Sequence, residues 1–197
     1  MNEMIYNTES VVNNEKYKPK QQSNPYTLVS EDDGILEKKV KPFDFSGPNM
    51  NPMEIAYRLI DTAKFHDSFC ITANQCGIDV SLFVAGSGDN FVAFFNPEII
   101  LNSDDTSVTQ ETDLSNMGFL LTVKRPKSIS IQYQDYTGED KIAQFDGLTS
   151  RVIQQCVDRV NGIDFKMRVS KFVLDRAKIA LNKRIKKFVK HNAYIKR

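Results

Sequence analysis

The segment from Gln154 to Gly162 places side chains at the spacing that a metal-binding helix uses. Two residues four positions apart lie on one face of a helix, and two His at that spacing can hold a divalent cation while an adjacent Glu handles the proton. In this chain the two positions hold Gln155 and Arg159, and the adjacent position holds Cys156. A Gln amide is a poor neutral ligand, and a guanidinium has no lone pair to offer a cation. The segment therefore predicts a helix that does not bind a metal.

Three segments, in this order and at this spacing, resemble the three motifs of peptide deformylases. Ser68 to Gly77 is similar to the first motif, Glu111 to Ser115 to the second, and Gln154 to Gly162 to the third. The resemblance covers about residues 28 to 190. It implies an α+β fold in which antiparallel and mixed sheets pack around a central motif helix, followed by a C-terminal helix.

The resemblance also implies what each motif position does in the family. Its members remove the formyl group from the N-terminal methionine of new chains, with a divalent metal held by one Cys and two His and a Glu as proton shuttle. The three ligand positions here hold Asp113, Gln155 and Arg159, and the Glu position holds Cys156. One carboxylate beside a guanidinium is a poor cation site. We therefore expect no metal, no cofactor, no catalytic residue and no enzymatic activity.

Other motif positions retain their groups or lose their flexibility. Gln75 and the backbone at Leu114 match family positions that could still bind a carbonyl. Ser68 and Cys70 replace two flexible glycines, and each added Cβ crowds a backbone that would otherwise approach a substrate closely. We therefore expect no small-molecule substrate.

Opposite charges occupy two of the former ligand positions. We predict an ion pair between Asp113 and Arg159 that joins the second motif to the helix, and a buried pair of this kind costs about 3–5 kcal/mol when one partner is removed. Glu111, Arg125 and Asp158 match residues of the family pattern and are interpreted as scaffold residues that fasten loops, not as catalysts.

The charge of the chain is strongly segregated. Twelve of the 26 Lys and Arg residues lie in residues 166–197 with only one of the 25 acidic residues, which leaves 14 basic and 24 acidic residues in the rest of the chain. A solvated helix face would account for some of this excess, and binding to an acidic surface would account for the remainder. The residues proposed to form the interaction helix are Lys178, Lys183, Arg184, Lys186, Lys187 and Lys190.

The length of 197 residues and a hydrophobic content of 41% suit one domain with extensions. We divide the chain into a flexible arm at residues 1–27, a core at 28–165, and a basic helix and tail at 166–197. The arm has few apolar residues and should be disordered unless a partner holds it.

The expected elements follow from periodicity and capping residues. A first helix should begin at Asn51, and residues 102–112 should form an acidic loop. The remaining expected elements are strands at 80–85, 91–96, 98–101, 119–123, 128–133 and 141–145, the motif helix at 150–161 and a last helix at 170–191.

The sequence contains no run of about 18 apolar residues and no basic start followed by an apolar run. We therefore expect neither a transmembrane segment nor export through a signal peptide. The three cysteines, Cys70, Cys76 and Cys156, are an odd number without metal-site spacing and are expected to be buried reduced thiols.

These observations lead to three functional hypotheses. The first is a catalytically inactive deformylase-like protein that serves as a structural module of a phage virion, in the tail or baseplate, with other protein subunits as partners. It would be located in the virion or the host cytoplasm. The alternative is a binding protein that docks on the ribosome through the basic helix. The third is a peptide deformylase with an altered active site, which uses Cys156 or Asp113.

Overall fold

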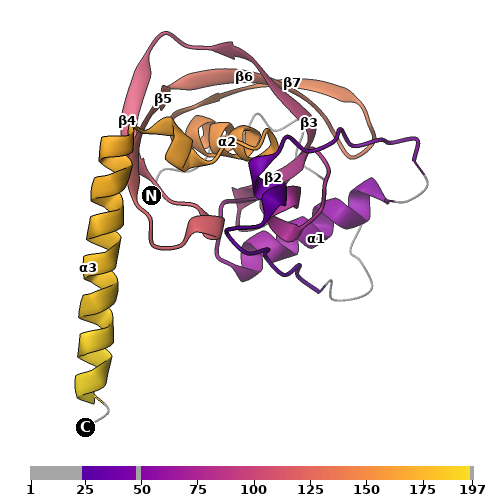
Figure 1. Ribbon diagram of the computed structural model, residues 1–197. Coiled ribbons are helices and arrows are strands. Elements are labelled where there is room, and N and C mark those ends of the chain that lie inside the picture. Colours follow the sequence, from indigo (N-terminus) through magenta and orange to yellow (C-terminus); the bar gives the residue numbers. More distant parts are fainter. Residues whose placement is uncertain (1–23, 48–49, 196–197) are drawn as a thin grey trace.

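The computed structural model describes residues 24–47 and 50–195 of the chain (Figure 1). A curved five-stranded sheet carries a helix on each face, a two-stranded sheet lies beside it, and a long helix projects from one corner. This architecture is the expected α+β fold with a C-terminal helix. None of the helices in these residues is long and apolar enough to cross a membrane.

The main sheet is antiparallel throughout, in the order β1-β2-β3-β6-β7. Its strands are β1 (Cys70–Thr72), β2 (Leu82–Ser87), β3 (Asn90–Asn102), β6 (Ser128–Gln134) and β7 (Asp140–Asp146). The two strands expected at 91–96 and 98–101 are one strand, β3. A register shift between Phe95 and Glu98 interrupts its pairing, and Asn96 has a φ of 48° there. A bulge of this kind bends a strand without ending it.

The central strands β2 and β3 are apolar on both faces because a helix covers each face. Leu82 of β2 packs in the cluster with α1 (Pro52–Phe65), whereas the next residue, Phe83, packs in the cluster with α2 (Gly147–Val160). Alternate residues of a strand point to opposite faces, so a strand between two helices needs an unbroken apolar run. Strands β6 and β7 bury one face more than the other, so burial alternates along them.

Both sheet-covering helices begin at side-chain caps. Asn51 accepts hydrogen bonds from the backbone N–H groups of Met53 and Glu54, which confirms the predicted start of α1. Asp146 caps α2 by accepting from the N–H of Gly147. The helix therefore starts three residues earlier than the predicted 150–161, because an acidic cap at the end of β7 leads directly into it.

Gly162 allows α2 to end against the early part of the chain. Its φ of 74° lies in the left-handed region, and a Cβ there would come within 2.6 Å of the carbonyl carbon of Lys38. The N–H of Val40 also donates to the carbonyl of Val160 at 3.0 Å. A glycine is therefore required at this crossing.

The prediction of an acidic loop at residues 102–112 is wrong over most of that range. Thr106–Glu111 form strand β4, which pairs antiparallel with β5 (Leu121–Pro126). Strand β4 exposes most of its side chains, so it has no apolar face to detect in the sequence. It is held by backbone pairing with β5 and by the buried side chain of its last residue, Glu111.

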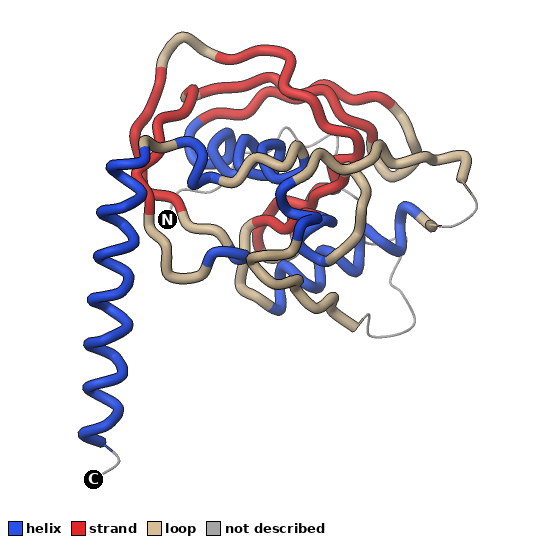
Figure 2. Tube along the Cα trace, viewed as in Figure 1, coloured by secondary structure: helices blue, strands red, loops and turns tan. Residues whose placement is uncertain are grey.

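The last helix, α3 (Lys171–Ile195), leaves the body after its first turns (Figure 2). Leu174 and Ala177 pack against the cluster that contains Leu121 and Val123. Ile185 and Phe188 continue the apolar face of this helix at helical spacing, but both are exposed. Apolar spacing shows a helix face and does not show that a neighbour covers it.

Residues 1–23 of the expected arm lie outside the described residues. Residues 24–27 are described, and they lie against α1. The Arg58 guanidinium donates to the carbonyl of Asn24 at 2.7 Å and lies 4.0 Å above the ring of Tyr26. The N–H of Tyr26 donates to the hydroxyl of Thr62 at 2.8 Å. The core therefore begins before residue 28.

Candidate functional site

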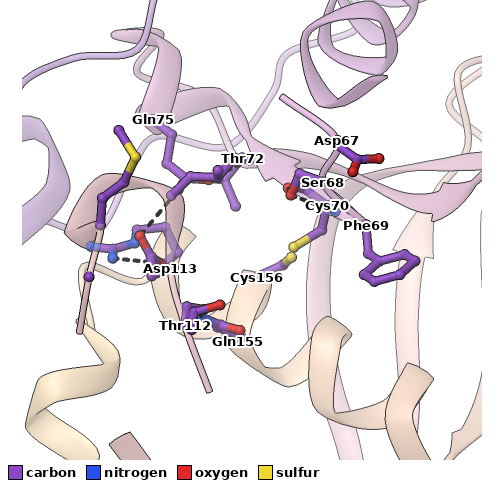
Figure 3. A pocket seen from close by; sticks show the side chains of 14 residues that line it. Asp67, Ser68, Phe69, Cys70, Thr72, Gln75, Thr112, Asp113, Gln155 and Cys156 are labelled. Atoms are coloured by element: carbon purple, nitrogen blue, oxygen red, sulfur yellow. Dashed lines mark hydrogen bonds and ion pairs between the residues drawn. The ribbon is translucent and has the colours of Figure 1, made fainter. Parts of the chain in front are cut away.

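A cavity of about 430 Å³ lies where the three motif segments meet (Figure 3). Its wall comes from β1 and the turn after it, from the loop after β4, and from α2. All six motif positions singled out in the sequence line this cavity: Gln75, Asp113, Leu114, Gln155, Cys156 and Arg159. Ser68 and Cys70 line it as well, so the added side chains form part of the wall without filling the cavity.

The structure brings Asp113 and Arg159 together at the positions of two family ligands. The guanidinium lies 2.8 Å from one carboxylate oxygen of Asp113, and both side chains are almost fully buried, with exposed fractions of 5% and 3%. Arg159 also lies 3.4 Å from Asp164, a partner that the sequence did not indicate. The other oxygen of Asp113 accepts from the N–H of Ser115 at 2.7 Å. The ion pair therefore links the second motif to α2.

The amide of Gln75 joins the first motif to the second. Its oxygen accepts from the N–H and the hydroxyl of Thr72, both at 3.0 Å. Its nitrogen donates to the hydroxyl of Ser115 at 3.0 Å. Both ends of the amide are thus held by the protein, which fixes the side chain at the edge of the cavity.

Gln155 and Cys156 occupy adjacent positions of α2 but different environments. Gln155 donates from its amide to the carbonyl of Thr112 at 2.7 Å. Burial raises the pKa of the Cys156 thiol well above its usual value, and the neighbouring Cys70 and then Asp113 raise it further. Cys156 is therefore a protonated thiol at neutral pH and a poor replacement for a proton-shuttling carboxylate.

These side chains do not fit the divalent cation that the family resemblance implies. Asp113 is neutralised by Arg159, and Gln155 turns its amide nitrogen to a backbone carbonyl. In residues 24–47 and 50–195, no three His, Cys, Asp or Glu side chains gather as a metal site requires. A guanidinium at a ligand position repels a cation and offers it no donor. The expectations of no metal and no cofactor remain predictions.

A second group of buried charged residues connects α2, which lines the cavity, to strands β4 and β5. Arg125 donates to both oxygens of Glu111 at 2.7 and 2.9 Å and to Asp158 at 2.7 Å. Arg151 makes a further ion pair with Glu111, and Arg168 makes one with Asp158. Arg125 thus bridges Glu111 and Asp158, and the three residues connect β4, β5 and α2. Arg151 and Arg168 were missed, because their spacing in the sequence shows no pairing pattern.

The basic residues of the proposed interaction helix are exposed along α3. One of them contacts the body, since Arg184 donates to the carbonyl of Gly118 at 2.6 Å. Met117 and Gly118 line the cavity, so α3 contacts its rim. Binding of this helix to the ribosome, another acidic surface or other subunits remains a prediction.

The third cysteine, Cys76, leads to a prediction about stability at high pH. Burial raises the pKa of its thiol from 9.0 to about 12, although the nearby Arg58 opposes this shift. Between these two values the unfolded chain releases a proton that the native protein retains, so the free energy of unfolding falls as the pH rises. Between about pH 8 and pH 10, the free energy of unfolding of the wild-type protein should fall by about 1 kcal/mol more than that of Cys76→Ala. Urea denaturation at the two pH values measures both changes. Equal losses in the two proteins would contradict this assignment.

Comparisons with known proteins agree with this geometry. A family model described as polypeptide deformylase matches residues 25–174. A peptide deformylase of Thermotoga sp. (strain RQ2) is 32% identical over 138 residues, which are 70% of this chain and 83% of the relative. The crystal structure of peptide deformylase from Thermotoga maritima matches with a TM-score of 0.70 and 31% identity, over 75% of this chain and 99% of that one. The peptide deformylase of Synechococcus elongatus, solved in complex with actinonin, matches with a TM-score of 0.73 and 28% identity. This match covers 84% of this chain and 91% of that one.

These matches correct the functional expectations. The hypothesis of a catalytically inactive structural protein of a phage virion, tail or baseplate is wrong, because the matching family and relatives are peptide deformylases, which are enzymes. The ribosome-binding alternative is not favoured by them either. The error came from equating the loss of the ligand side chains with the loss of function. Of the three hypotheses, a peptide deformylase with an altered site agrees best with the matches.

Proposed function

Because this chain belongs to the peptide deformylase family, we propose that it acts on the N-terminal residue of formylated peptides in an altered pocket. One observation carries the proposal: the three motif segments, far apart in the sequence, surround a single cavity. Its volume of about 430 Å³ suits the end of a peptide chain.

The cavity wall offers both apolar and polar contacts for such a peptide. Phe69 and Met117 both line the cavity. The side chain of Phe69 is about half exposed and that of Met117 is mostly exposed, so both are available to an apolar side chain of the ligand. Polar groups of Thr112 and Ser68 lie on the same wall and could pair with peptide N–H and C=O groups. This combination of apolar lining and few polar groups is typical of ligand pockets.

The proposed reaction is the hydrolysis of the formamide bond at the peptide N-terminus. Water adds to the formyl carbon, the carbon–nitrogen bond breaks, and formate leaves while the freed amine takes up a proton. Two of the family's ligand positions hold the ion pair of Asp113 with Arg159, so no part of the proposal is built on a metal. The protein's own contribution is to bind and orient the peptide end and to exclude water from its apolar side.

The proposal is tested with the full chain and the peptide formyl-Met-Ala-Ser. Formate release and peptide binding by calorimetry are measured on the same sample, and Phe69→Ala should weaken binding about three- to tenfold through lost apolar contact. Phe65→Ala is the matched control, because Phe65 is an exposed Phe of α1 that does not line the cavity. Absence of both binding and formate release would overturn the proposal. Binding without formate release would retain peptide recognition and remove the reaction.

A further inference from the structure

We propose that Cys70 and Cys156 are a redox-sensitive pair that an oxidant of the peroxide class converts into a disulfide in the wall of the pocket. The bond would join β1, which carries the first motif, to α2, which carries the third. The proposal concerns the thiols themselves, so it does not depend on whether the pocket binds a peptide.

The two cysteines come from distant parts of the sequence and meet at the cavity. Cys70 is the first residue of β1 and Cys156 lies in the middle of α2, and both line the cavity. Their sulfur atoms point toward each other in Figure 3. Cys70 packs against the core cluster that contains Cys156, and it lies close enough to raise the pKa of the Cys156 thiol. Two cysteines whose Cβ atoms point apart cannot be bridged without backbone movement, so this mutual orientation favours a disulfide.

The two thiols differ in their access to a dissolved oxidant. Cys156 is buried, with an exposed fraction of 2%, whereas Cys70 is only partly buried. A peroxide in the cavity therefore reaches Cys70 first. This difference fits a pair in which one cysteine reacts with the oxidant and the other resolves the product.

One molecule of hydrogen peroxide is enough to oxidise the two thiols to a disulfide. The sulfur of Cys70 attacks one oxygen of hydrogen peroxide, the oxygen–oxygen bond breaks, and Cys70 becomes a sulfenic acid with release of one water molecule. The sulfur of Cys156 then attacks the sulfur of Cys70, and the hydroxyl group leaves with the Cys156 proton as a second water molecule. Two thiols lose two hydrogen atoms and two electrons, and the peroxide is reduced to water.

Cys76 supplies an internal control for this reaction. It lies only six residues after Cys70 but packs against the other core cluster, on the side of α1. It also lies close to Arg58 of α1. Proximity in sequence therefore does not place it beside Cys156, and its thiol should stay reduced.

The experiment treats the full folded chain with hydrogen peroxide and then alkylates the remaining thiols after unfolding. We expect two of the three thiols to be lost, a disulfide-linked pair of tryptic peptides to form, and dithiothreitol to restore all three thiols. No Lys or Arg separates Cys70 from Cys76, so both fall in one tryptic peptide and the variants must identify the bridge. Cys76→Ser should keep the linked peptides, and Cys70→Ser should lose them while Cys156 stays reduced.

Circular dichroism of each variant before oxidation shows that it has folded. The proposal is overturned if the link persists in Cys70→Ser, if it disappears in Cys76→Ser, or if it joins two chains. It is also overturned if Cys70 of the wild-type protein proceeds to a sulfinic acid while Cys156 remains a thiol. Peptide binding does not enter any of these readouts, so a failure here is distinct from a failure of the proposed function.

Discussion

Arg159→Ala is expected to lower the free energy of unfolding by about 3–5 kcal/mol. The substitution removes the guanidinium that lies 2.8 Å from Asp113 and leaves a carboxylate with an exposed fraction of 5% without its cation. It also removes the contact with Asp164. An uncompensated buried charge costs far more than the loss of an exposed ion pair. Urea denaturation of the folded protein measures the effect.

A matched substitution and a double variant make this result specific. Arg176→Ala removes the same side chain from an exposed position of α3 and should change the free energy of unfolding by no more than about 0.5 kcal/mol. Adding Asp113→Asn to Arg159→Ala removes the stranded charge and should recover part of the loss. Additive effects of the two substitutions would show that the pair does not act as an interacting unit.

Glu111→Gln should destabilise the protein at least as much as Arg159→Ala. We expect it to lower the free energy of unfolding by about 3–5 kcal/mol. Glu111 accepts from both Arg125 and Arg151, and its side chain is 2% exposed. A neutral amide leaves Arg125 with Asp158 as its remaining carboxylate. It leaves the buried Arg151 with no carboxylate, only the Val123 carbonyl and the oxygens of Ser107. The amide also presents a donor where an acceptor is needed. Urea denaturation again measures the loss.

Glu98→Gln is the matched control, because Glu98 lies in strand β3 with an exposed side chain. It should leave the stability within about 0.5 kcal/mol of the wild type. Adding Arg151→Met to Glu111→Gln removes the cation that has lost its carboxylate and should restore part of the loss. A loss below about 1 kcal/mol for Glu111→Gln would mean that water or backbone groups solvate the two arginines.

Elements that carry a local chemical signal could be predicted from the sequence. The Asn51 cap followed by Pro52 marked the start of α1, because the free N–H groups of a first turn need a nearby acceptor. The alternation of Ile129, Ile131 and Tyr133 marked the half-buried strand β6 in the same way. The order of the three motifs placed their residues around one cavity.

Features that depend on a distant partner could not be predicted where the motif resemblance did not indicate that partner. Strand β4 exposes most of its side chains, so only the position of β5 explains it. Arg151 and Arg168 are polar helix-surface residues in the sequence, and their buried partners come from other elements. The approach of Cys70 to Cys156 likewise follows from the packing of β1 against α2.

The functional expectation failed for a different reason. The side chains at positions 113, 155 and 159 have other partners in the structure, and their interpretation as poor metal ligands stays a prediction. The further inference of an inactive virion protein combined the ligand positions with the expected N-terminal arm and the basic tail, and none of these is a measure of activity. A match to the polypeptide deformylase model over residues 25–174 and relatives of about one third identity assign the chain to a family of enzymes.

The projecting helix α3 divides the protein into parts that need not melt together. Its first turns pack on the body and end near the contact of Arg184 with Gly118, whereas Ile185, Phe188 and Val189 are all more than half exposed. Backbone amides beyond Arg184 are stabilised mainly by local helix propensity, so they should fray and exchange with solvent while those of α2 remain protected. Insertions, deletions or proteolytic trimming in these distal turns would therefore leave the cooperative core, and the cavity within it, unchanged.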